Sequence, residues 1–288
     1  MDYKLLKKEI FSEFSKLSID KILEVKNSKS TKGQKTKIVQ SIIDNAKNNI
    51  TITIPNRYPQ IQKTKLFMLI QYCYSVVSFE YRHMVWPYEY MAFSRRNGEL
   101  WERFCKSAWD NSEREHLHRI SAPKFSAVEK QFTKKIHEIV NDEKTFSAVN
   151  TVLKDIFELV GEINMAEDEM FSLEGVNHII DFKSGFGSNE KGNTLRLLAV
   201  GKAYKHWDEN VELLFLVRQN DNNNYLEKIK KSNLWNVHCG DSAYDKIDEL
   251  TNSGISEIRK EAINFREDLS NEFWKYLESN ELAHYLEW

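Results

Sequence analysis

The chain has 288 residues, of which 41% are apolar and 29% are charged, and its formal net charge is −2 at pH 7. This composition is ordinary for a soluble globular protein. The near-neutral charge argues against a protein that coats nucleic acid, but it is compatible with an enzyme that gathers basic residues in one cleft. Cys73, Cys105 and Cys239 are widely spaced. They indicate neither a disulfide framework nor a zinc site, which fits a reducing cytoplasm.

The hydropathy pattern gives no sign of a membrane partner. The first residues lead into a charged amphipathic stretch rather than a signal peptide. No run approaches the roughly 18 apolar residues that a transmembrane helix needs. We therefore expect a soluble, cytoplasmic protein.

The first 93 residues are expected to be largely helical. A lysine-rich segment at 26–37 is interpreted as a solvated loop or helix face, with a DNA-contacting arm as the alternative. Residues 51–54 (TITI) are expected as a short strand or an extended link before two prolines. Residues 61–93 are dense in aromatic side chains, which we assign mainly to the core, a base-stacking surface being the alternative.

The next segments alternate between helical and strand-like patterns. Apolar residues recur at helical spacing over 97–109 and 146–160. A strand-like section begins near Asp168, and a helix is expected at 194–205. The sequence further predicts buried strands at 211–217 and 235–240, a capped helix at 241–250 and helices over 255–288.

This order of elements predicts a mixed α/β architecture, with a mixed central β-sheet flanked by helices. We divide the chain into three parts. Residues 1–94 form a mostly helical region that contacts DNA or dimerises. Residues 95–250 form the α/β core, and residues 251–288 are C-terminal helices that pack on it.

One run, residues 179–193 (IIDFKSGFGSNEKGN), carries the most information about function. Residues i and i+2 of a strand point to the same face, so Asp181 and Lys183 lie side by side while Phe182 faces the other way. Burying an unpaired charge is costly. An apolar strand that carries two charges on one face therefore indicates a functional site.

The segment upstream of this strand suggests a second carboxylate. If Glu174 and Gly175 form the two-residue turn of a hairpin, Asp168 lies opposite Asp181, with the two Cβ atoms about 4.5–5.5 Å apart. One cation can bridge two carboxylates at that spacing. The alternatives for the first acid are Glu167 or Glu169, through a slip of one residue, or Glu162, through a longer hairpin.

Two paired carboxylates beside a lysine suit metal-dependent phosphodiester hydrolysis. Mg²⁺ prefers oxygen ligands and keeps several waters, so one or two carboxylates and a substrate phosphate suffice to hold it. The alternative is a surface salt bridge between Asp181 and a lysine, with Asp168 unrelated. Isolated acid-x-Lys tripeptides occur elsewhere, for example at 2–4 and 24–26, but without the upstream acidic strand and the glycine-rich exit.

The glycine-rich segment after the strand supplies hydrogen-bond donors. Its glycines permit close approach of the backbone to a ligand. Ser188, Asn189 and Lys191 offer donors for phosphates or base edges, and Arg196 follows on the next helix. We interpret these residues as DNA contacts, a structural turn being the alternative.

An acidic residue, a short hairpin and Asp-Phe-Lys at the end of an apolar strand together resemble the PD-(D/E)xK nuclease superfamily, in particular type II restriction endonucleases. The resemblance covers roughly residues 95–250. It implies a restriction-endonuclease-like core in which Asp168 and Asp181 hold Mg²⁺, with Mn²⁺ as a substitute and the Phe182 carbonyl as a further ligand. Lys183 would then orient or activate the attacking water.

That family often adds a glutamate from a helix that precedes the sheet. Glu102 or Glu99 is the candidate here, a solvated helix face being the alternative. The sequence departs from the family pattern at one point, because alanine and glutamate, and no proline, precede Asp168.

The resemblance implies an Mg²⁺-dependent, sequence-specific endonuclease that cleaves double-stranded DNA to 5′-phosphate and 3′-hydroxyl ends. We expect a homodimer, since a two-fold protein most simply binds a palindromic site, and a cognate DNA methyltransferase as the functional partner. Arg95 and Arg96 are added to the predicted DNA contacts. The alternatives are a repair, junction-resolving or modified-DNA nuclease, or a DNA-binding or interaction protein with a degenerate nuclease core.

Overall fold

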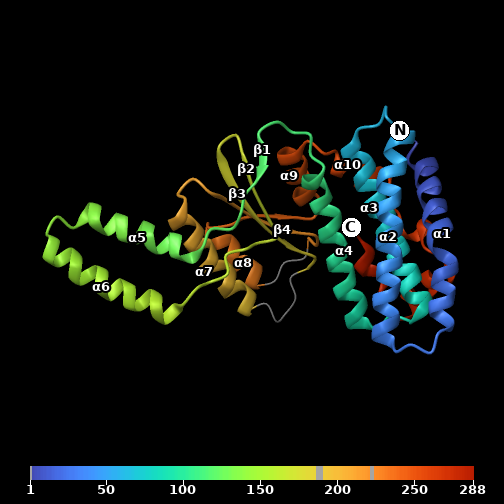
Figure 1. The fold of residues 1–288 in the computed structure, drawn as a ribbon, viewed down its shortest axis with the longest axis horizontal. Coiled ribbons are helices and arrows are strands. Elements are labelled where there is room, and N and C mark those ends of the chain that lie inside the picture. Colours follow the sequence, from blue (N-terminus) through green and yellow to red (C-terminus); the bar gives the residue numbers. More distant parts are fainter. Residues whose placement is uncertain (1, 186–190, 221–223) are drawn as a thin grey trace. The chain divides into compact units, whose positions relative to one another are not determined.

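The computed structural model describes residues 2–185, 191–220 and 224–288, and the chain forms two compact units (Figure 1). The helical unit comprises residues 1–114 and 240–288, and the sheet unit comprises residues 115–239. The boundaries predicted after residues 94 and 250 differ from these. The helices expected at 97–109 and 241–250 both belong to the helical unit, so the chain leaves this unit once and returns to it.

Four long helices begin the helical unit. They are α1 (Tyr3–Asn27), α2 (Lys32–Arg57), α3 (Lys63–Val85) and α4 (Tyr90–Asp110). The first three pack on one another, and α4 packs on α3. Helix α3 is buried on most of its circumference, as expected of a central helix. Most of the aromatic side chains at 61–93 are buried, which confirms their assignment to the core.

The strand or extended link expected at residues 51–54 is wrong, because α2 continues through this segment to Arg57. Ile50 and Ile54 lie four residues apart, so they share one helical face, and both are fully buried. This burial outweighs the preference of β-branched residues for strands. The lysine-rich segment at 26–37 contains the end of α1, a short link and the start of α2.

The C-terminal segment completes the helical unit. It contains α9 (Asp241–Thr251), α10 (Ile255–Glu261), α11 (Phe265–Asp268), α12 (Asn271–Ser279) and a 3₁₀ turn (Ala283–Leu286). Asp268 accepts hydrogen bonds from Lys7 (2.5 Å) and from the Tyr72 hydroxyl (2.6 Å). The Trp288 indole donates to the buried Asn97 side chain. These long-range contacts fix the end of the chain against the first helices.

The described part of the sheet unit contains one sheet with the order β1-β2-β3-β4-β5, of which Figure 1 labels the first four strands. The strands are β1 (Leu117–Arg119), β2 (Glu169–Leu173), β3 (Val176–Lys183), β4 (Glu212–Val217) and β5 (Asn236–Cys239). Strand β2 is antiparallel to both β1 and β3, whereas β4 is parallel to β3 and β5 is parallel to β4. The prediction of a mixed sheet flanked by helices is confirmed at this level.

The helices that accompany the sheet in the described part of this unit are α5 (Phe125–Ile139), α6 (Glu143–Val160), α7 (Lys191–Trp207) and α8 (Asn224–Lys231). Side chains from α5, α7 and α8 share one hydrophobic core with Ile179 of β3 and Leu213 and Phe215 of β4. These helices therefore cover the sheet face to which odd-numbered residues of β3 and β4 point. Within the described ranges of both units, none of the helices has the length and hydropathy needed to cross a membrane.

Candidate active site

The hairpin between β2 and β3 has the predicted two-residue turn. Leu173 pairs with Val176, and the φ angles of Glu174 and Gly175 are 52° and 85°. Positive φ at both central positions is what a type I′ hairpin turn requires. The ladder extends to the pair of Glu169 with Ile180. Asp168 directly precedes Glu169, and Asp181 directly follows Ile180. The same register therefore places Asp168 opposite Asp181, as the sequence predicted.

Asp181 is a buried carboxylate on β3. It is two residues from Ile179, so both side chains point to the sheet face that α7 covers. Ile180 and Phe182 point to the opposite face. Asp181 is only 5% exposed, and a charge at such a position requires compensation by neighbouring groups.

Two further acidic side chains lie beside Asp181. A carboxylate oxygen of Asp168 accepts a hydrogen bond from the backbone N–H of Phe182, at 2.7 Å. This bond fixes the Asp168 carboxylate next to β3. The Glu167 side chain is 3% exposed and lies close enough to Asp181 to interact with it. We call Glu167, Asp168 and Asp181 the acidic cluster.

Arg196, on the first turns of α7, compensates part of this negative charge. Its Nη1 donates to both carboxylate oxygens of Glu167, at 2.7 and 2.9 Å. Its Nη2 forms an ion pair with Asp181. Even so, burial, followed by the negative charges of Asp168 and Glu167, raises the pKa of the Asp181 carboxyl to about 8. Burial and the neighbouring acids thus outweigh the stabilisation that one guanidinium gives to the Asp181 carboxylate.

The other two candidates for the first acid lie elsewhere. Glu169 pairs with Arg119 of β1 through two bonds, at 2.9 and 2.8 Å. As the partner of Ile180, Glu169 lies on the sheet face opposite Asp181. Glu162 accepts a hydrogen bond from the backbone N–H of Phe125, at the start of α5. The geometry thus leaves Asp168 and Glu167 as partners of Asp181.

Lys183 is the last residue of β3 and lies on the same face as Asp181, half-buried. Its carbonyl accepts a hydrogen bond from the backbone N–H of Arg218, at 2.9 Å. Arg218 itself is buried directly after β4, and its Nε donates to the Ser184 hydroxyl at 3.1 Å. Two basic residues therefore follow the acidic cluster at the ends of adjacent parallel strands.

The donor set fits a hard divalent cation. The acidic cluster offers carboxylate oxygens, which Mg²⁺ prefers as ligands. Arg196 forms ion pairs with two of these acids, Glu167 and Asp181, so the cluster already stabilises one positive charge. Across residues 2–185, 191–220 and 224–288, no three His, Cys, Asp or Glu side chains gather as a ready metal centre. A divalent cation at the acidic cluster would therefore need water and substrate oxygens to complete its ligands.

The predicted residues of α4 belong to the helical unit. Glu102 pairs with Lys106 at 2.6 Å, and Glu99 pairs with Arg95 and Arg96. Both glutamates therefore form ion pairs with basic residues of their own helix, α4. The catalytic role of Glu102 or Glu99 stays a prediction, and so does DNA binding by Arg95 and Arg96.

The predicted DNA contacts near the motif divide into three groups. Ser188 and Asn189 lie outside the described residues. Lys191 is exposed at the first turn of α7. Arg196 is directed at the acidic cluster, so its immediate partners are protein carboxylates.

Three features of the site go beyond what the sequence predicts. The sequence offers Glu167 only as a register alternative, it does not indicate the contacts of Arg196 with Glu167 and Asp181, and it does not single out Arg218. A signal existed for Arg218, because a charged residue directly follows the buried strand at 211–217. For Arg196 the signal was weaker. Arg196 precedes the buried Leu197 on α7. No sequence motif marks this position as part of the site.

Comparisons with protein-family models, with curated proteins and with solved structures found no match. The resemblance to PD-(D/E)xK nucleases therefore rests on the motif and its surroundings in this chain.

Proposed function

We propose that this protein is an Mg²⁺-dependent DNA endonuclease whose active site is built on the β2–β3 hairpin. The observation that carries the proposal is the buried carboxylate Asp181, with Asp168 beside it and Lys183 on the same strand face. Buried like charges with a raised pKa are typical of functional sites. The mixed sheet flanked by helices agrees with the fold that the resemblance implies.

Each residue has a distinct part in this proposal. Asp168 and Asp181 would hold the cation, with the Phe182 carbonyl as a further oxygen ligand. When bound, Mg²⁺ would stabilise negative charge on the phosphate and lower the pKa of a water molecule. Lys183 would orient that water through its ammonium group. Arg196 balances the charge of Glu167 and Asp181 and so keeps the two carboxylates in place.

The proposed reaction is hydrolysis of a phosphodiester. The water oxygen forms a bond to phosphorus in line with the bond from phosphorus to the 3′ oxygen, which breaks. The water loses a proton to solvent, and the departing 3′ oxygen takes one up. The products are a 5′-phosphate and a 3′-hydroxyl, as the resemblance implies.

Sequence specificity belongs to the same proposal but rests on the resemblance to type II restriction endonucleases. A palindromic double-stranded site would be cleaved by a homodimer, with one active site for each strand. A cognate methyltransferase would protect the host DNA. Cleavage restricted to branched or methylated DNA would instead indicate the repair, junction-resolving or modified-DNA nuclease.

The test is digestion of long, unmethylated DNA at an Mg²⁺ concentration on the order of 10 mM, which suits weak carboxylate sites. Wild type is compared with Lys183→Ala, with an EDTA control and with Lys202→Ala. Lys202 is an exposed lysine of α7, so it controls for loss of a positive charge in the same unit. Branched and methylated substrates are digested in parallel.

Discrete fragments from wild type and Lys202→Ala, absent with Lys183→Ala and with EDTA, are the expected result. Fragments that persist with Lys183→Ala would remove Lys183 from the mechanism. Tight DNA binding without cleavage of any substrate in Mg²⁺ or Mn²⁺ would overturn the proposal in favour of a binding protein with a degenerate core.

A further inference from the structure

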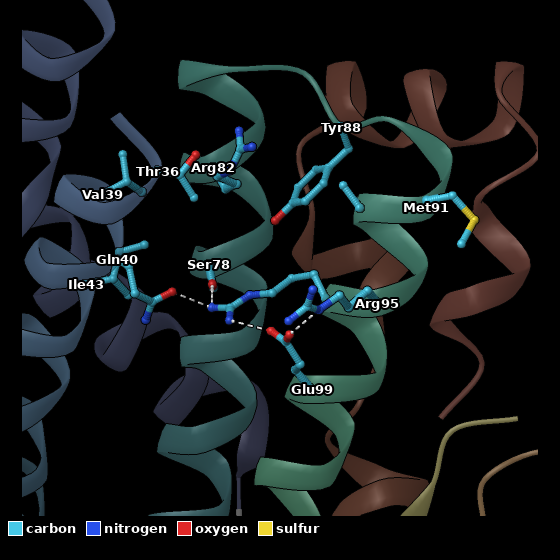
Figure 2. A pocket seen from close by; sticks show the side chains of 12 residues that line it. Thr36, Val39, Gln40, Ile43, Ser78, Arg82, Tyr88, Met91, Arg95 and Glu99 are labelled. Atoms are coloured by element: carbon cyan, nitrogen blue, oxygen red, sulfur yellow. Dashed lines mark hydrogen bonds and ion pairs between the residues drawn. The ribbon is translucent and has the colours of Figure 1, made fainter. Parts of the chain in front are cut away.

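The helical unit contains a cavity of about 540 Å³ between α2, α3 and the start of α4 (Figure 2). This volume is within the range of small-molecule sites. The cavity is lined entirely by residues of the helical unit. It therefore shares no residue with the acidic cluster, so ligand binding there can be tested whether or not the protein cleaves DNA.

Arginine side chains give the cavity a positive wall. Arg82 of α3 and Arg95 and Arg96 of α4 line it, and Glu99 is the one carboxylate among its described lining residues. Three guanidinium groups and one carboxylate leave a net charge of +2. Arg82 and Arg96 lie close enough that each positive charge acts on the other. A lining of this kind attracts an anion.

Hydrogen bonds hold Arg96 in place. Its Nη2 donates to the Gln40 side-chain carbonyl at 2.7 Å and to the Ser78 hydroxyl at 2.6 Å, and its Nη1 pairs with Glu99 at 3.3 Å. The side chain is only 15% exposed. Gln40 is fixed in turn by bonds to Asp44 and Tyr74. The guanidinium is thus pre-organised, which lowers the entropic cost of binding a ligand.

Tyr88 supplies the observation that points to a ligand. Its side chain is 3% exposed, and among the described residues its hydroxyl has no hydrogen-bond partner. Figure 2 shows this hydroxyl pointing into the space between the lining side chains. A buried hydroxyl without a partner is destabilising and rare in native proteins. An acceptor on a bound ligand would satisfy it.

The surroundings fix the Tyr88 ring. It makes edge contacts with Phe79 and Phe93, at centroid distances of 6.2 and 5.3 Å, and the Arg82 guanidinium lies 5.4 Å from its centroid. Burial raises the pKa of the hydroxyl, so it stays protonated at neutral pH. It is therefore a rigid donor for a ligand oxygen.

Part of the remaining lining is apolar. Val39 and Ile43 of α2 and Met91 and Ala92 of α4 contribute this part. A ligand that fills the cavity therefore needs an anionic group for the arginines and Tyr88, and a compact apolar or aromatic group for the aliphatic side chains.

We propose that this cavity, the arginine pocket, binds a terminal phosphate monoester joined to a compact aromatic group, of the size of one nucleotide. A phosphate monoester carries a charge of about −1.5 to −2 and three strong acceptor oxygens. That charge matches the net +2 of the lining, and the oxygens match the guanidinium forks and the Tyr88 hydroxyl. The ligand is either a free nucleoside monophosphate or the 5′-phosphate end of a nucleic-acid strand.

The test is calorimetric titration of the full chain with dAMP, deoxyadenosine, inorganic phosphate, and one oligonucleotide with and without a 5′-phosphate. We expect binding of dAMP or of the phosphorylated oligonucleotide, with deoxyadenosine and the unphosphorylated strand weaker by about tenfold or more. Binding of dAMP would identify a free nucleotide as ligand. Binding of the phosphorylated strand alone would identify the strand end.

Tyr88→Phe should lower the affinity for the phosphorylated ligand about tenfold, since it removes one hydrogen bond to a charged group. Arg82→Gln should weaken it further. Tyr58→Phe and Arg57→Gln are the matched controls, because these side chains pair with Glu9 at another place in the same unit. Both controls should bind as wild type does.

The melting temperature of each protein without ligand separates binding from folding. Tyr88→Phe removes a buried hydroxyl that lacks a partner within the described structure, so its melting temperature should equal or exceed that of wild type. Wild type should be stabilised by the phosphorylated ligand. Failure of wild type to bind any phosphorylated ligand at millimolar concentration, or equal binding by Tyr88→Phe, would overturn the proposal. Inorganic phosphate binding as tightly as dAMP would overturn its aromatic part.

Discussion

The two units each concentrate charge of one sign, and they stabilise it in different ways. In the sheet unit, the acidic cluster lies on one hairpin and is partly neutralised by Arg196 from the next helix. In the helical unit, the arginine pocket draws its residues from three helices and the link between two of them, and Glu99 neutralises part of its charge. Both regions keep an excess of one charge that a ligand of the opposite sign would balance.

The two regions differ in how their polar groups are held. Backbone geometry fixes the acidic cluster, since strand alternation and hairpin register decide which carboxylates share a face. Side-chain packing and side-chain hydrogen bonds fix the arginine pocket. In both, the compensating residue, Arg196 or Glu99, carries the same sign of charge as the expected ligand. We therefore expect each to compete with that ligand, so that removing it should favour ligand binding.

The largest effect is expected from Asp181→Asn. The amide has nearly the shape of the carboxylate but cannot hold a cation as strongly, so DNA cleavage should fall by about 10³-fold or more. The fold should persist, with the free energy of unfolding within about 1 kcal/mol of wild type, because burial and the neighbouring acids already favour the uncharged form of this side chain. Cleavage rate and thermal unfolding are measured on the same preparation.

Asp155→Asn is the control, because Asp155 is exposed on α6 of the same unit. It should cleave at the wild-type rate. Addition of Mg²⁺ should raise the melting temperature of wild type and of Asp155→Asn more than that of Asp181→Asn. If Asp181→Asn cleaved DNA at the wild-type rate, the acidic cluster would have only a structural role.

The next largest effect is expected from Arg196→Ala. This change leaves Glu167 and Asp181 without their shared guanidinium. Because the Arg196 side chain is 42% exposed, the loss is smaller than for a fully buried pair, about 1–3 kcal/mol. If the acidic cluster accepts cations, Mg²⁺ should restore part of this stability, and should raise the melting temperature more than it does for wild type.

Arg119→Ala provides a matched comparison for this test. Arg119 pairs with the buried Glu169 through the same kind of two-bond contact, but on the opposite face of the sheet. The Arg119→Ala protein should also be less stable than wild type, but Mg²⁺ should not raise its melting temperature more than that of wild type. Equal responses of the two variants to Mg²⁺ would argue against a cation site at the acidic cluster.

A smaller effect is expected from Gly175→Ala. Gly175 has a φ of 85°, where a Cβ atom is strained, so the change should cost about 1 kcal/mol. Gly192→Ala is the control, since a Cβ there would meet open space at the start of α7. It should be neutral or slightly stabilising. If thermal unfolding ranks the two variants in the reverse order, strain at the positive φ of Gly175 does not decide the stability of this turn.

The sequence predicted the hairpin and its surroundings because the relevant signals are local. The two turn residues, the apolar strand that carries Asp181 and Lys183, and the glycine-rich exit all fall within residues 168–193. The helices at 97–109 and 194–205 and the strand at 211–217 were also predicted, since periodicity depends only on neighbouring residues. The strand expected at 51–54 was wrong because packing against other helices decided its conformation.

The arginine pocket could not be predicted in the same way. Its basic side chains are 13 residues apart on two helices, from Arg82 to Arg95, and Tyr88 lies in the link between them. Only the packing of α2, α3 and α4 brings them around one cavity. Arg96 was assigned to DNA from its place in the sequence alone, whereas its bonds to Gln40 and Ser78 depend on tertiary contacts.

The smallest effect is expected from Glu99→Gln, the counterpart of Arg196→Ala in the helical unit. Glu99 pairs with Arg95 and Arg96 at 3.0 and 3.3 Å and is 41% exposed, so solvent screens its charge. Removing that charge should raise the affinity for the phosphorylated ligand about two- to fivefold. Glu13→Gln, which removes a carboxylate from α1, should leave the affinity unchanged. A weaker affinity for Glu99→Gln would show that Glu99 orients the arginines more than it opposes the anion, and the symmetry between the two regions would then fail.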